Sequence, residues 1–406
     1  MRPANPPPDG QGCLSVGVIT TSRADFGHII WPVRKMQEHP DITPFVIAMG
    51  AHLSPRFGYT LDAFRDHHID VDETLESLIS SDTDTGMAKT IGVSMMGLAD
   101  ILSRRRPDVL MIIADRYEML AAAAAAMALR IPIAHIEGGE ISEGAIDDAV
   151  RNALTKLSHL HFVPHKPAAQ RVIAMGEEPW RVHTVGAPSL DHLRHRELMP
   201  FEALAQSLGI DARRPYDLIS FHPVTLMQDT VAEAEAFYAA LKTIDGQKIF
   251  CFPNSDAGSH TLIKKAQEFA APRHDAHIFT NLDHWVYWNL LHRARAIIGN
   301  SSSALMEAPS VPLPAINVGR RQRGRLMAKN VIDCAADRQA IQTAYRRAVS
   351  DDFRNNLSGM RNPYGDGHAG ERICAALTQY RDRARLLDKR AQPVIAVEDI
   401  VGFKRK

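Results

Sequence analysis

The 406-residue sequence has few cysteines and no net charge, and each shortage excludes a class of protein. The four cysteines, Cys13, Cys251, Cys334 and Cys374, are far apart and form no Cys-x-x-Cys pair, so neither a structural zinc site nor a disulfide framework is expected. Lysine plus arginine and aspartate plus glutamate both count 47, which leaves no net field to attract nucleic acid or an anionic membrane. Any anion binding must therefore be local.

Long apolar runs are also missing, because no segment approaches the roughly 20 apolar residues of a membrane span. Residues 1–11 are rich in proline and polar residues and have no apolar core of the signal-peptide type. We therefore predict a flexible leader over residues 1–13, a cytoplasmic location and no membrane partner.

A third absence concerns cofactors. The loop after the first predicted strand, Thr20 to Gly27, contains no glycine-rich dinucleotide fingerprint. No histidine-rich spacing of the zinc type accompanies the acidic motifs described below. We expect neither a cofactor nor a metal ion.

What the sequence does contain is a regular alternation of apolar, strand-like runs with helix-like periodic segments. Parallel strands need crossover connections, so this alternation predicts parallel sheets covered by helices on both faces. The predicted strands are 14–20, 43–49, 108–114, 131–136, 161–163 and 182–185 in the first half, and 217–221, 248–252, 277–280, 296–298 and 313–318 in the second. The predicted fold class is α/β, with two Rossmann-like doubly wound domains facing a cleft.

The chain is longer than one ordinary hydrophobic core requires, so two domains are expected. Gly186-Ala187-Pro188 interrupts the alternation before it resumes, and we place the hinge there. The predicted domains are residues 14–190 and 191–369. Residues 370–390 predict one long amphipathic helix that crosses back to the first domain, so that 370–406 form a C-terminal helix and tail.

Two predicted strands of the first half end in acids, at Asp115-Arg116 and at Glu137-Gly138-Gly139-Glu140. Ligands of open parallel sheets bind beyond the carboxyl ends of the strands, so these charges are positioned for chemistry. With Asp147 they form a group of carboxylates near one crevice. Neighbouring carboxylates push one another's pKa values apart, as acid and base catalysis requires. Helix N-caps and ion pairs are the alternative, particularly for Asp147.

Two loops predict a site for a diphosphate. Ser22 and Arg23 lie between the first strand and a helix, and Ser301 and Ser302 have the same setting in the second half. Amides at a helix N-terminus, hydroxyls and an arginine all favour an anion, and a diphosphate held between the domains would explain both loops. An exposed arginine and ordinary serine caps are the alternative. Glu307 is expected about two turns into the helix that follows the serines.

Further candidates follow other strands of the second half. His222 could donate to a phosphate or transfer protons, although a lone loop histidine is more often a local hydrogen-bonding residue. Asn254 follows the strand 248–252 at a similar crevice position. The basic cluster from Arg320 to Arg325 predicts contact with a polyanionic ligand, or closure against the acidic loop of the other domain. A solvated loop is the alternative.

Taken in order, several blocks of the chain resemble the hydrolysing UDP-N-acetylglucosamine 2-epimerases. The blocks are Ser-Arg-Ala-Asp-Phe-Gly, Asp-Arg-Tyr-Glu, His-Ile-Glu-Gly-Gly-Glu, His-Pro-Val-Thr, Gly-Asn-Ser-Ser-Ser and Arg-Gln-x-Gly-Arg. The resemblance runs from about Val16 to about Gly367. It implies two Rossmann-like domains of the glycosyltransferase-B type, with the nucleotide mainly in the second. One residue departs from the pattern, since Ala114 stands before Asp115 where the family commonly has glycine.

The resemblance implies removal of the C2 proton and loss of UDP from C1, followed by addition of water with inversion at C2. UDP-N-acetylglucosamine would thus give UDP and N-acetylmannosamine through a 2-acetamidoglucal, as in sialic acid biosynthesis. Asp115, Glu137 and Asp147 resemble the family's catalytic acids and His222 its essential histidine, with the base and the acid left unassigned. The residues expected to bind the UDP-sugar are Arg23, Arg116, His222, Asn254, Ser301, Ser302, Glu307 and Arg321.

Other readings stay open. An enzyme acting on a UDP-linked 2,4-diacetamido-2,4,6-trideoxy sugar, in a pathway of the legionaminic-acid type, would use the same elimination and differ only in its sugar pocket. A glycosyltransferase or a nucleotide-sugar sensor would need no C2 proton chemistry, and the acid cluster weighs against both. The resemblance also implies a homo-oligomer, a dimer or a tetramer, in which the alanine-rich helix 118–130 could contact a partner subunit.

Overall fold

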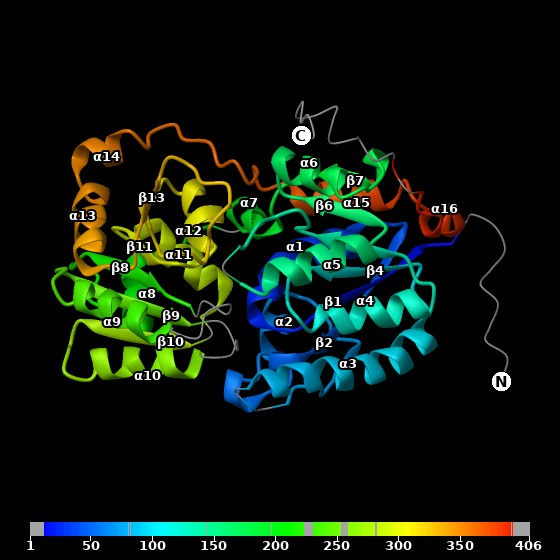
Figure 1. Cartoon of the computed structure of the whole chain (residues 1–406), viewed down its shortest axis with the longest axis horizontal. Helices are drawn as coiled ribbons and strands as arrows, with labels where there is room; N and C mark the ends of the chain where they lie inside the picture. Colours follow the sequence, from blue (N-terminus) through cyan, green and yellow to red (C-terminus); the bar gives the residue numbers. More distant parts are fainter. Residues whose placement is uncertain are drawn as a thin grey trace, which may run out of the picture.

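The computed structural model describes residues 12–390 and 392, apart from residues 80, 82, 144, 196, 223–229, 253–258 and 281. The described chain forms two lobes, each built on one sheet (Figure 1). We call the lobe with strands β1 to β7 the N-lobe and the lobe with strands β8 to β13 the C-lobe. The last helices, drawn in red, return to the N-lobe. None of the described helices is long and apolar enough to cross a membrane.

The described part of the N-lobe sheet has seven parallel strands in the order β3-β2-β1-β4-β5-β6-β7. The strands are β1 (Leu14–Thr20), β2 (Ile42–Met49), β3 (Glu73–Leu75), β4 (Val109–Ile113), β5 (Ile133–Ile136), β6 (Leu160–Val163) and β7 (Val182–Thr184). The sequence did not predict β3, because its three residues are partly exposed and too few to show a period.

The described part of the C-lobe sheet has six parallel strands in the order β10-β9-β8-β11-β12-β13. The strands are β8 (Tyr216–Ser220), β9 (Gln247–Phe252), β10 (Ala276–Thr280), β11 (Ile297–Gly299), β12 (Ala315–Val318) and β13 (Val331–Cys334). Leu218 packs in a core with Trp288, whereas its neighbour Ile219 packs in another with Phe237. Both faces of this sheet are therefore covered, and the predicted α/β doubly wound class is confirmed.

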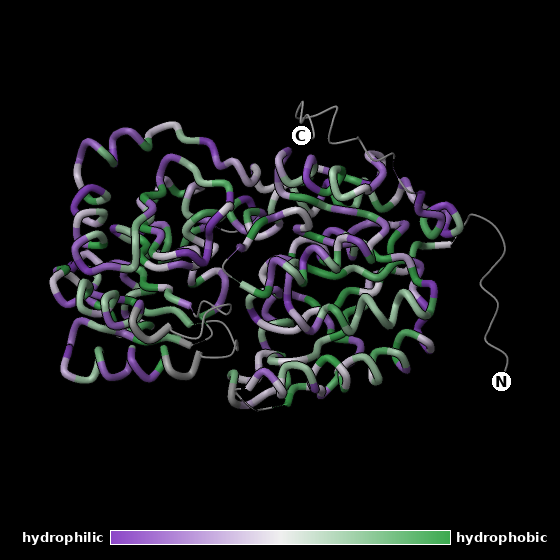
Figure 2. Tube along the Cα trace, viewed as in Figure 1, coloured by the Kyte–Doolittle hydropathy of each residue, from purple (hydrophilic) through white to green (hydrophobic). Residues whose placement is uncertain are grey.

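Helices connect the strands in both lobes. They are α1 (Arg23–Glu38), α2 (Asp62–Asp66), α3 (Asp84–Arg105), α4 (Met119–Ala128), α5 (Asp147–Leu157), α6 (Lys166–Ala174), α7 (His192–His195), α8 (Phe201–Leu208), α9 (Thr230–Leu241), α10 (Ser259–Ala270), α11 (His284–Arg293), α12 (Ser303–Met306), α13 (Arg338–Ala348), α14 (Asp351–Asn355), α15 (Ala369–Leu377) and α16 (Arg383–Leu387). Figure 2 shows hydrophobic residues along the inner strands and hydrophilic residues on the outer turns. The sequence did not predict α3, since its glycines and β-branched residues weaken the helical signal.

The strand order reverses at one point in each sheet, between β1 and β4 and between β8 and β11. Ligands of doubly wound sheets bind beyond the strand ends at this switch point. Arg23 and Asp115 follow β1 and β4, while His222 and Ser301 follow β8 and β11. The topology therefore brings the sequence motifs to the two switch points.

The chain passes between the lobes twice, and the two crossings are hydrogen-bonded to each other. The backbone N–H of Ala187 donates to the carbonyl of Tyr364 at 2.7 Å. After the second crossing, α15 packs against α1 of the N-lobe. The backbone amides of Ala369 and Gly370, at the start of α15, donate to the Asp191 carboxylate at 2.9 and 2.7 Å.

The single helix predicted over residues 370–390 is wrong, because the structure has two short helices there. The hydroxyl of Tyr380, between them, donates to the Trp180 carbonyl at 3.0 Å. Asp382 then caps a new helix by accepting from the Arg385 amide at 3.0 Å. Tertiary contact at Tyr380 and a local cap thus break a segment whose charge pattern favours one helix.

Candidate active site

Two adjoining cavities open between the lobes, with volumes of about 160 and 120 Å³. We call the one against the C-lobe the hydroxyl cavity, because Ser220, Ser301, Ser302 and Ser303 line it. We call the other the acid cavity, because Asp115, Glu137 and Asp147 line it. His28, Ser302 and Arg321 line both, so the two cavities form one continuous site.

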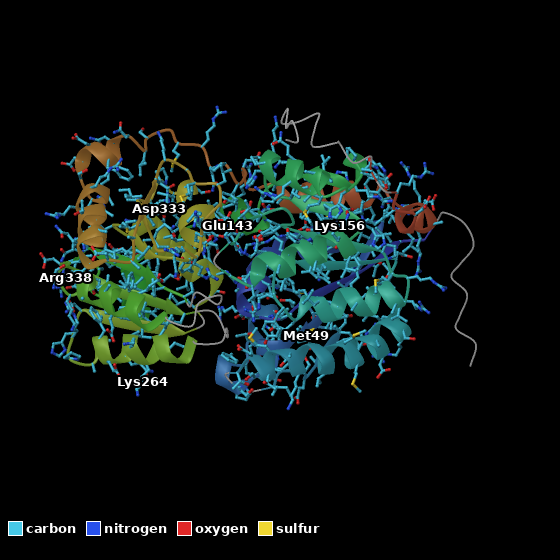
Figure 3. All side chains as sticks on the ribbon, viewed as in Figure 1. Met49, Glu143, Lys156, Lys264, Asp333 and Arg338 are labelled. Atoms are coloured by element: carbon cyan, nitrogen blue, oxygen red, sulfur yellow. The ribbon has the colours of Figure 1, made fainter. Side chains whose placement is uncertain are left out.

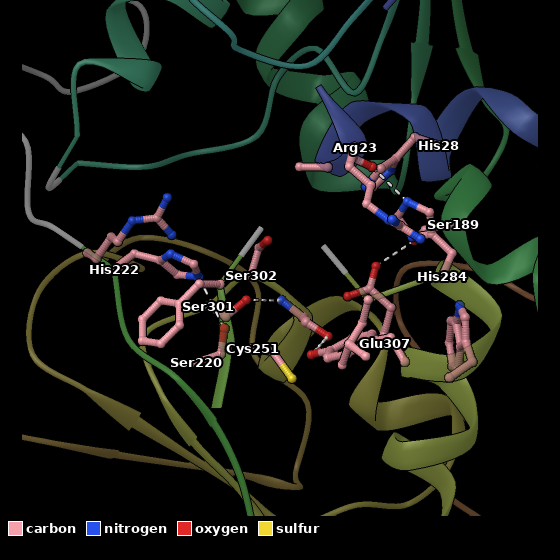
Figure 4. A pocket seen from close by; sticks show the side chains of 17 residues that line it. Arg23, His28, Ser189, Ser220, His222, Cys251, His284, Ser301, Ser302 and Glu307 are labelled. Carbon is pink, nitrogen blue, oxygen red and sulfur yellow. Dashed lines mark hydrogen bonds between the residues drawn. The ribbon is translucent and has the colours of Figure 1, made fainter. Parts of the chain in front are cut away.

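Asp25 organises the loop that begins α1. Its carboxylate accepts hydrogen bonds from the backbone amides of Thr21 and Ser22, both at 2.8 Å, and from the Thr20 hydroxyl at 2.9 Å. This network fixes Arg23 at the cleft, where its guanidinium lies 3.5 Å from Asp283 of the C-lobe. Figure 4 shows Arg23 and His28 on α1, facing the serines and Glu307.

The C-lobe approaches α1 closely through His284. Its Nε2–H donates to the Arg23 carbonyl at 2.6 Å. The ring occupies the space beside Gly27, where an added Cβ would lie only 2.2 Å from the imidazole. Glycine at this position therefore allows the two lobes to meet at the edge of the hydroxyl cavity.

Gly299 shapes the opposite wall of the hydroxyl cavity. Its φ is +145°, and a Cβ there would come within 2.0 Å of the Ser220 carbonyl oxygen. The following Asn300 accepts from the His222 backbone amide at 2.7 Å and donates to the His222 carbonyl at 2.9 Å. These bonds hold His222 at the wall of the hydroxyl cavity, which Ser301 and Ser302 also line. Asn254 lies outside the described residues.

Glu307 lies in the hydroxyl cavity, where its Oε1 accepts from the Ser189 hydroxyl at 2.6 Å. The prediction that it lies two turns into a helix is wrong, since α12 ends at Met306. Pro309 follows, and proline has no N–H to continue the helix. Aromatic side chains also line this cavity, among them Phe252, Tyr287 and Trp288.

Asp115 follows a strained turn at the end of β4. Ala114 has a left-handed backbone with φ +51°, a conformation that glycine adopts at less cost. Its carbonyl accepts from His135 Nε2–H at 2.8 Å. The Asp115 carboxylate accepts a hydrogen bond from Arg151 of α5, which is itself buried. Asp115 is thereby fixed toward the acid cavity.

Glu137 comes directly after β5 and itself has a left-handed backbone, with φ +64°. Its buried carboxylate lies 2.7 Å from Nδ1 of His28 on α1. Burial by itself would lower the pKa of His28, but the charge of Glu137 and this hydrogen bond raise it to about 9. His28 is therefore an imidazolium at neutral pH.

The basic loop closes against the acidic loop of the N-lobe, one of the two outcomes predicted. Arg321, Arg323 and Arg325 lie 3.8, 3.5 and 3.1 Å from Asp147, Glu143 and Glu140 respectively. Figure 3 labels Glu143 between the lobes. Arg321 also lines both cavities, so one loop can close the cleft and face a ligand.

Glu140 differs from the other predicted carboxylates. It is buried away from the acid cavity, and His165 and Arg325 lie 2.6 and 3.1 Å from its oxygens. These charges lower its pKa to about 2, against the opposing effect of burial. Glu140 therefore joins the lobes and does not face the crevice.

The cleft thus receives ten of the eleven predicted site residues. They are Arg23, Asp115, Arg116, Glu137, Asp147, His222, Ser301, Ser302, Glu307 and Arg321. Sequence reasoning missed His28, Arg151 and Ser189. Arg151 stands four residues after Asp147 on the same helix, a spacing that could have revealed it. In the part of the chain that the structure describes, no three His, Cys, Asp or Glu side chains form a group that could hold a metal ion.

The sequence is similar to a known family and to several of its members. The profile of the UDP-N-acetylglucosamine 2-epimerase family matches residues 34–378. A hydrolysing UDP-N,N'-diacetylbacillosamine 2-epimerase of Legionella pneumophila is 33% identical, over 91% of this chain and 97% of the relative. A hydrolysing GDP/UDP-N,N'-diacetylbacillosamine 2-epimerase of Campylobacter jejuni is 31% identical, over 84% and 88%.

The fold also matches a solved structure. The UDP-GlcNAc 2-epimerase of Neisseria meningitidis, crystallised with UDP-GlcNAc, superposes with a TM-score of 0.78 at 18% identity. The match covers 90% of this chain and 100% of that chain. It confirms the glycosyltransferase-B-like arrangement of the two lobes.

Proposed function

The chain belongs to the UDP-N-acetylglucosamine 2-epimerase family of enzymes, and from that premise we propose that it is a hydrolysing 2-epimerase of UDP-N,N'-diacetylbacillosamine. The reaction would release UDP and the free sugar with inverted C2. The sequence put UDP-N-acetylglucosamine first and the diacetamido sugar second. The relatives reverse that order, because both the Legionella and the Campylobacter enzymes are named for the diacetamido sugar.

The observation that carries the reaction type is the junction of the two cavities. Elimination breaks two bonds of the sugar, C2–H and the bond from C1 to the diphosphate oxygen. Carboxylates on one side and hydroxyls with arginines on the other match those two demands. Such an elimination moves no hydride, so it requires no redox cofactor.

The roles follow from the placement of each group. Arg23, Ser301 and Ser302 would hold the diphosphate, with Arg321 at the junction. Glu307 would accept hydrogen bonds from ribose hydroxyls, and the aromatic side chains of the hydroxyl cavity would contact uracil. Asp115, Glu137 and Asp147 would divide the removal of the C2 proton and the later addition of water.

The lining of the acid cavity supports a deoxy sugar. Met87, Ile146 and Met306 line it together with the carboxylates. Diacetylbacillosamine carries a methyl group at C5 where N-acetylglucosamine carries a hydroxymethyl. An apolar wall stabilises the methyl by about 1 kcal/mol or more and leaves a hydroxyl without a partner.

Proton NMR in deuterated water tests the proposal, with the two UDP-sugars supplied in parallel. We expect UDP together with a free sugar carrying deuterium at C2, formed faster from the diacetamido substrate. Asp115→Asn should abolish UDP release and leave UDP binding intact. Binding of UDP without release from either sugar would overturn the enzymatic assignment. Faster turnover of UDP-N-acetylglucosamine would overturn the choice of sugar alone.

A further inference from the structure

His28 is the one group at the cavity junction whose chemistry neither the motifs nor the proposed roles explain. It lies on α1, lines both cavities and holds Glu137 through Nδ1 at 2.7 Å. No described residue accepts or donates a hydrogen bond at its Nε2. Nδ1 of His28 is thus hydrogen-bonded to Glu137, and Nε2 is available to a ligand at the junction of the cavities.

We propose that His28 is a catalytic residue whose Nε2–H donates to the substrate oxygen that joins C1 to the β-phosphate. The inference rests on the proposed elimination. In that step the C2–H electron pair becomes the C1=C2 bond, a carboxylate takes the proton, and the C1–O electron pair leaves on the phosphate. A donor at the departing oxygen stabilises the charge that develops there.

The surroundings of His28 support a cation at this position. Glu137 lies at ion-pair distance, and the carboxylates of Glu307, across the hydroxyl cavity, and of Asp25, on α1, add to the field that raises its pKa. His284 of α11 also faces it, and burial lowers the pKa of that ring to about 4, so it adds no positive charge. With Nδ1–H directed to Glu137, the protonated ring must present Nε2–H to the cavity.

His28→Gln tests the proposal, because glutamine keeps a hydrogen-bonding side chain but cannot carry the charge. We expect kcat for UDP release to fall about 100-fold or more, with the Kd for UDP changed less than about threefold. The wild-type rate should decline as pH rises through about 9, where His28 loses its proton. The variant should not show this decline. A variant with wild-type kcat and an unchanged pH profile would overturn the proposal.

His161→Gln is the matched control. His161 is also buried and paired with a glutamate, Glu177, at 3.0 Å, but it lines neither cavity. It should leave kcat per folded molecule and the pH profile unchanged. If His28→Gln instead lost kcat, UDP affinity and thermal stability together, with no change in pH profile, His28 would be structural and the proposal would be wrong.

An NMR titration separates this inference from the proposed function. The His28 imidazole resonance, identified by its loss in His28→Gln, should titrate far above 7 and shift downward in Glu137→Gln. Titration near the usual 6.5 in the wild type overturns the charged His28, whatever the enzyme turns over. If the wild type released no UDP from either sugar, the proposed function would fail even with a charged His28.

Discussion

The molecule contains two buried histidine–glutamate pairs that look alike and differ in charge. His28 and Glu137 meet at 2.7 Å in the cleft, and His161 and Glu177 meet at 3.0 Å beneath the C-terminal segment of the chain. The pKa of His28 is raised to about 9, whereas burial lowers the pKa of His161 despite its glutamate. A histidine beside a carboxylate is therefore charged in one place and neutral in the other.

The difference lies in the other cations around each carboxylate. Lys156 and Lys389 lie 2.5 and 2.8 Å from Glu177, so its charge is already balanced, and the pKa of Glu177 is lowered to about 2 although burial opposes this. Among the described residues, His28 is the only cation at ion-pair distance from Glu137. Lys389 also donates to the carbonyls of Lys156 and Ser158, so Lys389 joins the segment that follows α16 to the N-lobe.

Glu137→Gln breaks the cleft pair and should have the largest effect. With the proton-transfer role proposed for Glu137, loss of its carboxylate should lower kcat for UDP release about 10³-fold. Single-turnover assays of UDP formation measure this loss, and UDP affinity should change little. A variant that keeps one tenth or more of wild-type kcat, roughly within 1.4 kcal/mol in barrier, would remove Glu137 from the chemistry.

Glu177→Gln breaks the other pair and should act on stability alone. Removing the buried carboxylate leaves Lys389 and the half-exposed Lys156 without their counter-charge, which should lower the free energy of unfolding by about 1 to 3 kcal/mol. Urea unfolding measures this cost. The kcat of the folded fraction should stay at the wild-type value, and a loss of kcat comparable with that of Glu137→Gln would erase the distinction between the pairs.

Arg325→Gln removes the ion pair between Arg325 and Glu140, which joins the two lobes. The side chains of Arg325 and Glu140 are only 7% and 2% exposed, so losing the pair should raise KM about tenfold. Arg323 pairs with Glu143 on the surface of the same loop, and Arg323→Gln should change KM less than about twofold. Equal effects of the two substitutions would show that burial does not set the strength of closure.

The smallest effect is the pH dependence of stability. The folded pKa of His28 lies above its usual value of 6.5, so its contribution is fully present below 6.5 and is lost as pH rises through about 9. The stability difference between wild type and His28→Gln should therefore shrink as the pH rises through about 9. His161, with a lowered pKa, should show the opposite sign, losing stability as pH falls below 6.5. Unfolding curves at several pH values compare the two.

Much of the cleft could be read from the chain because parallel sheets place function at strand ends. Asp115 and Glu137 stop two apolar runs, and Arg23 and Ser301 each follow a strand, so local pattern was enough to select them. The pattern failed where contacts outside the segment decide the structure. Tyr380 divides the predicted C-terminal helix by reaching Trp180, and α12 ends before Glu307.

The sequence by itself determined the two doubly wound sheets, the positions of the acids and hydroxyls, and the family. Each of these depends on periodicity or on short motifs within a few residues. Only the tertiary structure decided that His28 meets Glu137, 109 residues away, and that Glu140 pairs with Arg325 of the other lobe. The charge of a buried side chain depends on every neighbour within a few ångströms, and those neighbours come from elements that only the fold brings together.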